Sequence, residues 1–228
     1  MTQFRRPQRT TETAIIPGMI LRRMEELLMP IRCTFCGTRC ESFEPWVCSA
    51  CMQDLPWRTP LCTTDHAPLS VIAAPLEYAF PIDAALKLLK FQRRCDYVPA
   101  FAELLWQLVG ELPGDIDALL PMPLHWRRQA TRGFNQAFEL SRALQKYSGL
   151  SLLSSIRRVR ATPFQSGLDA ADRRHNLRNA FCAREAVTAK HVLIVDDVIT
   201  TGESCARLAA VAIAAGAKKV SALAVARA

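Results

Sequence analysis

The segment from Val192 to Ser204 constrains the fold of this chain more than any other part of the sequence. It begins with aliphatic residues, continues through an acidic pair and the hydroxyl- and glycine-rich turn Thr200–Gly202, and ends where an alanine-rich helical pattern starts. A short apolar run that leads through a tight turn into a helix is the repeating unit of parallel sheets covered by helices. The segment therefore predicts an α/β fold, with a parallel sheet flanked by helices.

The rest of the chain after Pro68 repeats this alternation of strands and helices. Half of the residues are hydrophobic and only 9 are glycine, which suits a packed core and excludes a collagen-like chain. The α/β domain is expected to span residues 68–228. Apolar spacing predicts strand 70–78, helices 82–91 and 98–108, strand 116–120, helix 133–147, strand 155–160, helix 170–177, strand 190–195, helix 203–215 and strand 218–226.

The turn after the acidic pair has the composition of a phosphate-binding loop. At the carboxyl end of a parallel strand, backbone N–H groups and the start of a helix point outward and attract anions. Three hydroxyl side chains in Thr200–Ser204 add donors, and Gly202 lets the backbone approach a ligand closely. Asp196 and Asp197 suit hydrogen bonds from sugar hydroxyls, or a position near Mg²⁺. A capped helix with two incidental aspartates is the plainer alternative.

The formal net charge of +8 comes from one part of the chain. Residues 121–178 hold eleven Lys and Arg against three acidic residues, and the remaining residues are balanced at 18 of each sign. A basic field of this size suits a polyanion, either a phosphorylated small molecule or nucleic acid. Arginines spread over solvated helix faces would give the same count.

Nine cysteines are present, and five of them fall within nineteen residues. Cys33 and Cys36 form one Cys-x2-Cys knuckle, and Cys48 and Cys51 form a second, with eleven residues between the pairs. Two such knuckles supply the four thiolates of a closed tetrahedral site, so these four residues are the predicted ligands of one structural Zn²⁺. Metal binding would stabilise a segment too polar to fold by apolar burial. Cys40 has no knuckle partner, and a redox dithiol is the alternative for either pair.

The N-terminal region and the cellular setting follow from similar patterns. Residues 1–16 lack periodicity and are expected to form a flexible arm, while residues 17–67 are expected to form a short helix followed by the cysteine ribbon. Clustered thiols favour a reducing compartment. No apolar run suits a secretory signal or a membrane span, so a cytoplasmic protein without a membrane span is expected.

Several motifs occur together in a characteristic order. After the cysteine ribbon come Pro-Met-Pro-Leu-His at 121–125, Arg-Gly-Phe-Asn-Gln at 132–136, Gln165, Arg174-x-Asn176, and the acidic pair followed by Thr-Thr-Gly-x-Ser. In these motifs the sequence resembles the competence-protein ComF family, which joins a cysteine ribbon to a type I phosphoribosyltransferase domain. The resemblance covers nearly everything from Cys33 to Ala228.

The resemblance implies a ligand and a chemistry. Type I phosphoribosyltransferases bind phosphoribosyl pyrophosphate (PRPP) with Mg²⁺, and a nucleophile attacks the anomeric carbon as pyrophosphate leaves. The acidic pair would hold the ribose, the following turn the 5-phosphate, and the 122–125 turn the pyrophosphate. The residues assigned in this way are Asp196 and Asp197 as the catalytic pair, and Pro123, Leu124, Arg132, Thr200, Thr201, Gly202, Glu203 and Ser204 as PRPP-binding residues.

Two classes of function stay open at this point. One is a transferase of the pentosyltransferase type whose acceptor is not identified. The other is a non-enzymatic protein of DNA uptake, competence or gluconate utilisation, which uses the pocket as a sensor, or its basic face or ribbon to contact DNA or a partner protein. Binding to DNA should weaken steeply with salt, whereas PRPP binding should require Mg²⁺.

Two details qualify the resemblance. Family members often carry a second cysteine pair after the first ribbon, but here Cys62 stands alone beside Asp65 and His66, so one zinc is expected and Cys62 is packed or free. Asn135 either contributes to function or only caps a helix, and His125 is expected to be a loop residue rather than a general base.

Overall fold

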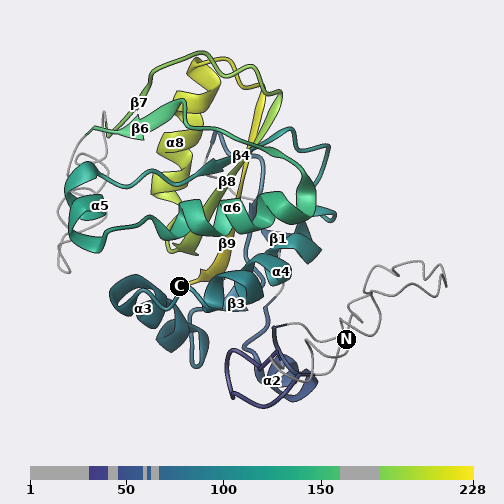
Figure 1. The fold of residues 1–228 in the computed structure, drawn as a ribbon. Helices are drawn as coiled ribbons and strands as arrows, with labels where there is room; N and C mark the ends of the chain where they lie inside the picture. The colour runs from purple at the N-terminus through teal and green to yellow at the C-terminus, as the bar shows by residue number, and fades with distance from the viewer. Residues whose placement is uncertain (1–30, 41–45, 59–60, 63–66, 160–179) are drawn as a thin grey trace, which may run out of the picture. The chain divides into compact units, whose positions relative to one another are not determined.

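A computed structural model describes residues 31–40, 46–58, 61–62, 67–159 and 180–228 (Figure 1). The expected arm, the expected helix before the ribbon and the expected helix at 170–177 lie outside the described residues. Contacts divide the chain into two units, Met1–Asp54 and Leu55–Ala228, and the domain boundary expected at 67–68 stays a prediction. Within the described part of the chain, no helix has both the length and the apolarity to cross a membrane.

The first unit contains the cysteine ribbon. Its described residues include an antiparallel bridge between Arg32 and Arg39 and the short helix α2, Ser49–Asp54. Gly37 follows the first knuckle with a positive φ of 74°, a conformation that favours glycine, and donates its N–H to Cys33 O at 2.8 Å. The tight turn thus brings the two cysteines of the first knuckle close together.

The second unit is built on one large sheet. Among the described residues it has seven strands in the order β1-β2-β9-β8-β4-β5, with β3 also paired to β9. All its pairs are parallel except β1 with β2. The strands are β1 (Leu61–Cys62), β2 (Ile72–Ala73), β3 (Leu76–Glu77), β4 (Ala118–Pro121), β5 (Ser151–Leu152), β8 (His191–Ile199) and β9 (Lys219–Arg227), and β6 (Ile156–Arg158) and β7 (Phe181–Ala183) form a separate antiparallel pair.

Helices flank this sheet, as expected from the sequence, and the predicted fold class is confirmed. The helices of this unit are α3 (Ile82–Gln92), α4 (Tyr97–Val109), α5 (Trp126–Arg132), α6 (Gln136–Ser148) and α8 (Glu203–Ala214). α4 packs on α6, which contacts β4 and β8, while α8 contacts β7, β8 and β9. Val192 and Ile194 alternate along β8 into the core shared with Leu208 of α8, and in Figure 1 α6 crosses in front of the strands.

Two predicted elements differ from those observed. The single strand expected at 70–78 is divided into β2 and β3, because Pro75 between them has no N–H to donate to a neighbouring strand. The helix expected at 133–147 begins three residues later, as α6, and a separate helix, α5, precedes it. Gly133 has a φ of 75° and ends α5, and Asn135 then caps α6 with its side chain. The sequence analysis missed α5 altogether.

Candidate functional site

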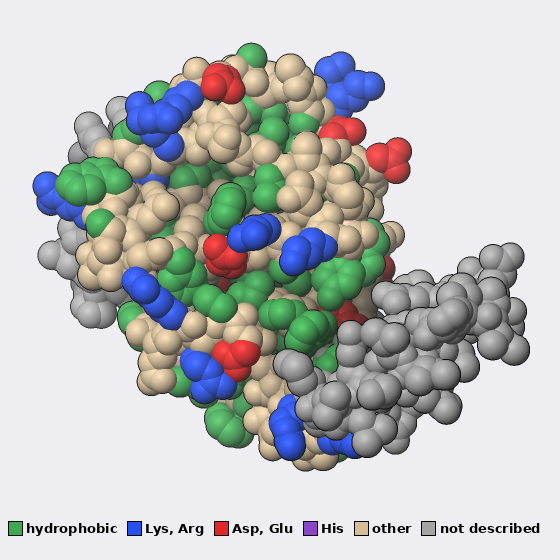
Figure 2. Space-filling view, viewed as in Figure 1, with side chains coloured by type: hydrophobic (Ala, Val, Ile, Leu, Met, Phe, Trp, Pro, Cys, Tyr) green, Lys and Arg blue, Asp and Glu red, His purple; other side chains and the backbone are tan. Residues whose placement is uncertain are grey.

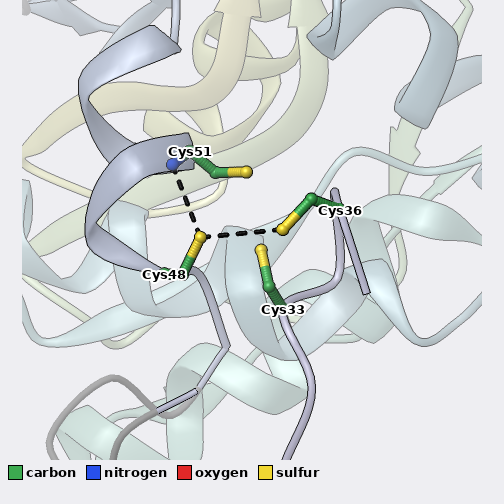
Figure 3. A group of neighbouring side chains, drawn as sticks. All are labelled: Cys33, Cys36, Cys48 and Cys51. Carbon is green, nitrogen blue, oxygen red and sulfur yellow. Dashed lines mark hydrogen bonds between the residues drawn. The ribbon is translucent and has the colours of Figure 1, made fainter. Parts of the chain in front are cut away.

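The four knuckle cysteines meet in one place. The Sγ atoms of Cys33, Cys36, Cys48 and Cys51 all lie within 4.8 Å of one another, and those of Cys36 and Cys48 are 3.7 Å apart. Figure 3 shows the sulfurs of the two knuckles turned toward a common space. A tetrahedral zinc–thiolate site with bonds of about 2.3 Å places its sulfurs about 3.8 Å apart. The donor type, number and spacing therefore fit a metal ion such as zinc.

The thiols of the cluster differ in acidity. Hydrogen bonds from Thr38 to the Cys36 sulfur lower the pKa of Cys36 to about 6, whereas burial and the neighbouring thiols raise the pKa of Cys51. The backbone N–H of Cys51 points at the Cys48 sulfur, 3.5 Å away, at the start of α2. Cys40 is buried but is not one of the four. The side chain of Cys62, with Asp65 and His66, lies outside the described residues.

The acidic pair lies inside a strand and not after it. The strand expected to end at residue 195 continues to Ile199, because β9 remains paired with it as far as Arg227. Asp196 is half-buried and Asp197 is buried. Burial and the neighbouring charge of Asp197 raise the pKa of Asp196 to about 8, so at neutral pH the pair carries one negative charge more readily than two.

The turn after β8 has the conformation of a helix entrance. Thr200 and Thr201 are exposed, and Gly202 adopts a left-handed conformation, with φ 81° and ψ −7°, directly before α8. A Cβ would strain this position, which explains the glycine. Ser204 is half-buried in the first turn of α8. The carboxylate of Glu203 is paired with Arg207 at 2.9 Å.

A second loop lies at the same edge of the sheet. Met122 follows β4, and its N–H donates to Val195 O of β8 at 2.8 Å. The Asn135 side chain donates to Met122 O at 3.0 Å and accepts from Ala137 N–H at 3.1 Å. Asn135 therefore caps α6 and fixes the loop. His125 is buried and caps α5, with its Nδ1 accepting from the Arg127 N–H in the first turn of that helix, which agrees with its expected place in the loop.

The predicted site residues are not all described in the same detail. Pro123 is buried and Leu124 half-buried, both in the loop after β4. Arg132 ends α5, where its guanidinium lies over the Phe91 ring, 5.7 Å from the ring centroid. Gln165 and the Arg174-x-Asn176 motif lie outside the described residues. The roles assigned to all of these residues stay predictions.

One contact of the acidic pair was missed by the sequence analysis. The ammonium group of Lys90, on α3, lies 2.8 Å from Oδ2 of Asp197. In the sequence Lys90 belongs to a helical segment that also holds Lys87, and a lysine at helical spacing resembles any solvated helix residue. Only the fold brings it to the acidic pair.

The chain is similar in sequence to several proteins of known name. No protein-family model matches it. The DNA utilization protein YhgH of Salmonella typhimurium is 36% identical over 183 residues, which cover 76% of this chain and 74% of that protein. YhgH of Escherichia coli strain K12 is 33% identical over 183 residues with the same coverage. Competence protein F of Haemophilus influenzae is 32% identical over 184 residues, covering 75% of this chain and 74% of the relative.

A search of solved structures gives a weaker likeness. Glutamine phosphoribosylpyrophosphate amidotransferase from B. subtilis, complexed with ADP and GMP, matches with a TM-score of 0.37 and 19% identity. The match covers 55% of this chain and 26% of that enzyme, and a likeness of this size carries no argument about ligand or activity. The identities and coverages of the YhgH proteins and competence protein F are decisive: the chain belongs to their family, the ComF family.

Proposed function

We propose that the second unit binds PRPP with Mg²⁺ where β4 and β8 end, and that it transfers the phosphoribosyl group to an acceptor. The observation that carries this proposal is the meeting of two loops at one sheet edge. Asp196, Asp197 and the turn before α8 belong to β8 and its exit, and the loop after β4 is hydrogen-bonded to β8 through Met122 N–H and Val195 O. In parallel sheets, ligands bind at this edge.

Each part of the proposed ligand has a matching chemistry. The 5-phosphate would accept hydrogen bonds from the turn Thr200–Ser204 and from the first turn of α8. The Asp197 carboxylate would accept hydrogen bonds from the ribose hydroxyls. The pyrophosphate would lie along Met122–His125, close in sequence to the arginines of α5. Mg²⁺ bound to the pyrophosphate would neutralise part of its charge.

The proposed transfer forms one bond at the anomeric carbon and breaks another. A nucleophilic nitrogen of the acceptor attacks C1, the C1–O bond to pyrophosphate breaks, and pyrophosphate leaves with the bonding electrons. Positive charge develops on the sugar ring, so the negative charge of the acidic pair would stabilise the transition state. The rest of the catalysis would come from holding the reactants in line.

Release of pyrophosphate tests the transferase proposal. The purified protein is incubated with PRPP, Mg²⁺ and a panel of nucleobases and amines, and pyrophosphate is followed by a coupled assay. We expect release that depends on both Mg²⁺ and one class of acceptor. If PRPP binds but no acceptor leads to release of pyrophosphate, the transfer step is rejected, and a role as a non-enzymatic PRPP sensor is favoured.

A second function is favoured by a separate observation on the surface. Arg127 lies 5.3 Å from the Trp126 ring centroid, and Trp126 is 64% exposed. Phe91 is 71% exposed beside Arg132. Exposed aromatic rings beside arginines suit stacking with single-stranded DNA, and Figure 2 shows green and blue side chains adjoining over α5.

This DNA-binding alternative predicts a salt dependence. The fluorescence anisotropy of a dye-labelled single-stranded oligonucleotide should give an affinity that falls linearly with salt on logarithmic axes. Trp126→Ala should weaken binding about tenfold, since loss of one stacked base costs about 1–3 kcal/mol. Trp106→Ala on α4 is the matched control. Equal binding by the two variants would argue against this surface.

A further inference from the structure

Lys90 forms a shielded ion pair that the sequence did not reveal. Its Nζ lies 2.8 Å from Oδ2 of Asp197, and the two side chains are only 20% and 11% exposed. The lysine comes from the last turn of α3, whereas the aspartate belongs to β8. Ion pairs with this little solvent exposure are screened by salt far less than surface pairs, so the contact holds the two side chains together more firmly than an exposed pair would.

The acidic pair needs such a cation. Two adjacent carboxylates in a largely buried strand repel one another, and burial together with the charge of Asp197 raises the pKa of Asp196. Lys90 contacts only one of them, which makes the two acids unequal. Its charge also lowers the pKa of Asp196, but less than burial and Asp197 raise it. The result is a more readily protonated Asp196 beside an Asp197 whose carboxylate is paired with Lys90.

The contacts of Asp197 also fix its direction. Oδ1 accepts from the N–H of Val198 at 2.9 Å, and Oδ2 is held by Lys90. Each carboxylate oxygen has about two acceptor positions, so Oδ1 keeps one for a further donor, whereas Oδ2 has less than 1 Å² of exposed surface and faces Lys90. A hydroxyl group of a sugar ring is a donor that matches the free position on Oδ1.

The end of α3 is itself anchored. Arg93 ends the helix with a positive φ of 55° and donates its N–H to Leu88 O. Its Nε donates to Arg132 O at 2.9 Å, and the Arg132 guanidinium lies over Phe91. The turn that carries Lys90 is therefore attached to the end of α5, beyond the loop proposed to hold pyrophosphate.

We propose that Lys90 is a positioning residue, which holds the Asp197 carboxylate in the direction that lets its Oδ1 accept a hydrogen bond from a ring hydroxyl of a pentose phosphate. This inference rests on the proposed PRPP site and adds a residue and a ligand feature to it. Lys90 acts through Asp197 and does not contact the phosphate groups. Removal of its charge therefore weakens the binding of ligands that contain the sugar and leaves the binding of pyrophosphate unchanged.

Calorimetric titrations with three probes separate these effects: ribose 5-phosphate, 2-deoxyribose 5-phosphate, and inorganic pyrophosphate with Mg²⁺. The variants are Lys90→Met, which keeps the length without the charge, and Lys90→Arg, which keeps the charge. Lys87→Met is the matched control, because Lys87 pairs with Asp83 on the exposed side of the same helix. Thermal unfolding of each variant is measured alongside.

The expected pattern is specific. Lys90→Met weakens the binding of ribose 5-phosphate about tenfold, because the hydrogen bond between the sugar and the Asp197 carboxylate loses its fixed direction. The loss of affinity is smaller for 2-deoxyribose 5-phosphate and absent for pyrophosphate. Lys90→Arg keeps most of the affinity for ribose 5-phosphate, and Lys87→Met has no effect on any of the three probes. In an Asp197→Asn background, Lys90→Met lowers the affinity for ribose 5-phosphate by less than about a further twofold. If Lys90→Met alone unfolds, the comparison of Asp197→Asn with the double variant still tests the inference.

Other results overturn the inference. Equal losses for pyrophosphate and ribose 5-phosphate would show that Lys90 contacts the anion itself. Unchanged affinity of Lys90→Met for ribose 5-phosphate would remove the positioning role while leaving the pocket intact. Absence of binding of all three probes to the unmutated protein would reject the proposed function, and the role of Lys90 with it.

Discussion

Replacing Cys48 by serine is expected to release a bound zinc ion and to unfold the described ribbon residues 31–40 and 46–54. Apart from the cysteines, the only buried hydrophobic residue described before Leu55 is Val47. Such a segment has almost no apolar core, whereas structural zinc contributes about 10–16 kcal/mol of apparent binding free energy in small zinc domains. Loss of one of four thiolates should therefore remove most of its stability.

Metal analysis and limited proteolysis measure this effect. The unmutated chain should hold one zinc per chain, and Cys48→Ser close to none, with new cleavage sites before residue 55. Cys95→Ser is the control, because Cys95 is an exposed cysteine outside the cluster and should keep the metal. Full zinc content and unchanged cleavage in Cys48→Ser would contradict the four-cysteine assignment.

Replacing Asp197 by asparagine is expected to lower the affinity for PRPP at least tenfold. The substitution keeps the shape of the side chain but removes the charge that pairs with Lys90 at 2.8 Å. It also replaces one acceptor oxygen with a donor NH₂, so the side chain can accept fewer hydrogen bonds than the carboxylate does. Hydrogen bonds to a charged group are worth roughly 1.5–3 kcal/mol each, which corresponds to about ten- to a hundredfold in affinity.

Asp83→Asn is the matched control for this substitution. Asp83 also pairs with a lysine of α3, but on an exposed face, where an ion pair contributes little. Calorimetry with PRPP and Mg²⁺ should show unchanged binding for Asp83→Asn. If Asp197→Asn retains the full affinity of the unmutated protein, the acidic pair does not bind the ribose.

The parts of the site that depend on local sequence were predictable. Cysteine spacing alone identified the four thiols that the fold brings within 4.8 Å, because a knuckle is a local turn. The exit of β8 into α8 was equally local, since Gly202 and the alanine-rich helix follow one another in the chain. Residue type and spacing carry this information without any long-range contact.

The parts that depend on long-range pairing were not predictable. Aspartate disfavours strands, so the sequence analysis ended β8 before Asp196, but pairing of β9 with Asp196, Val198 and Ile199 extends the strand. The position of Lys90 depends on how α3 packs, and the sequence contains no signal for that packing. Gly133 was taken for a helix start because the α5 residues before it lack an apolar stripe.

The most direct test of the account is a calorimetric titration of the unmutated, zinc-loaded protein with PRPP, with and without Mg²⁺, at low and moderate salt. We expect saturable binding at one site per chain that requires Mg²⁺ and persists at moderate salt. No binding under any of these conditions would contradict the proposed pocket at the ends of β4 and β8.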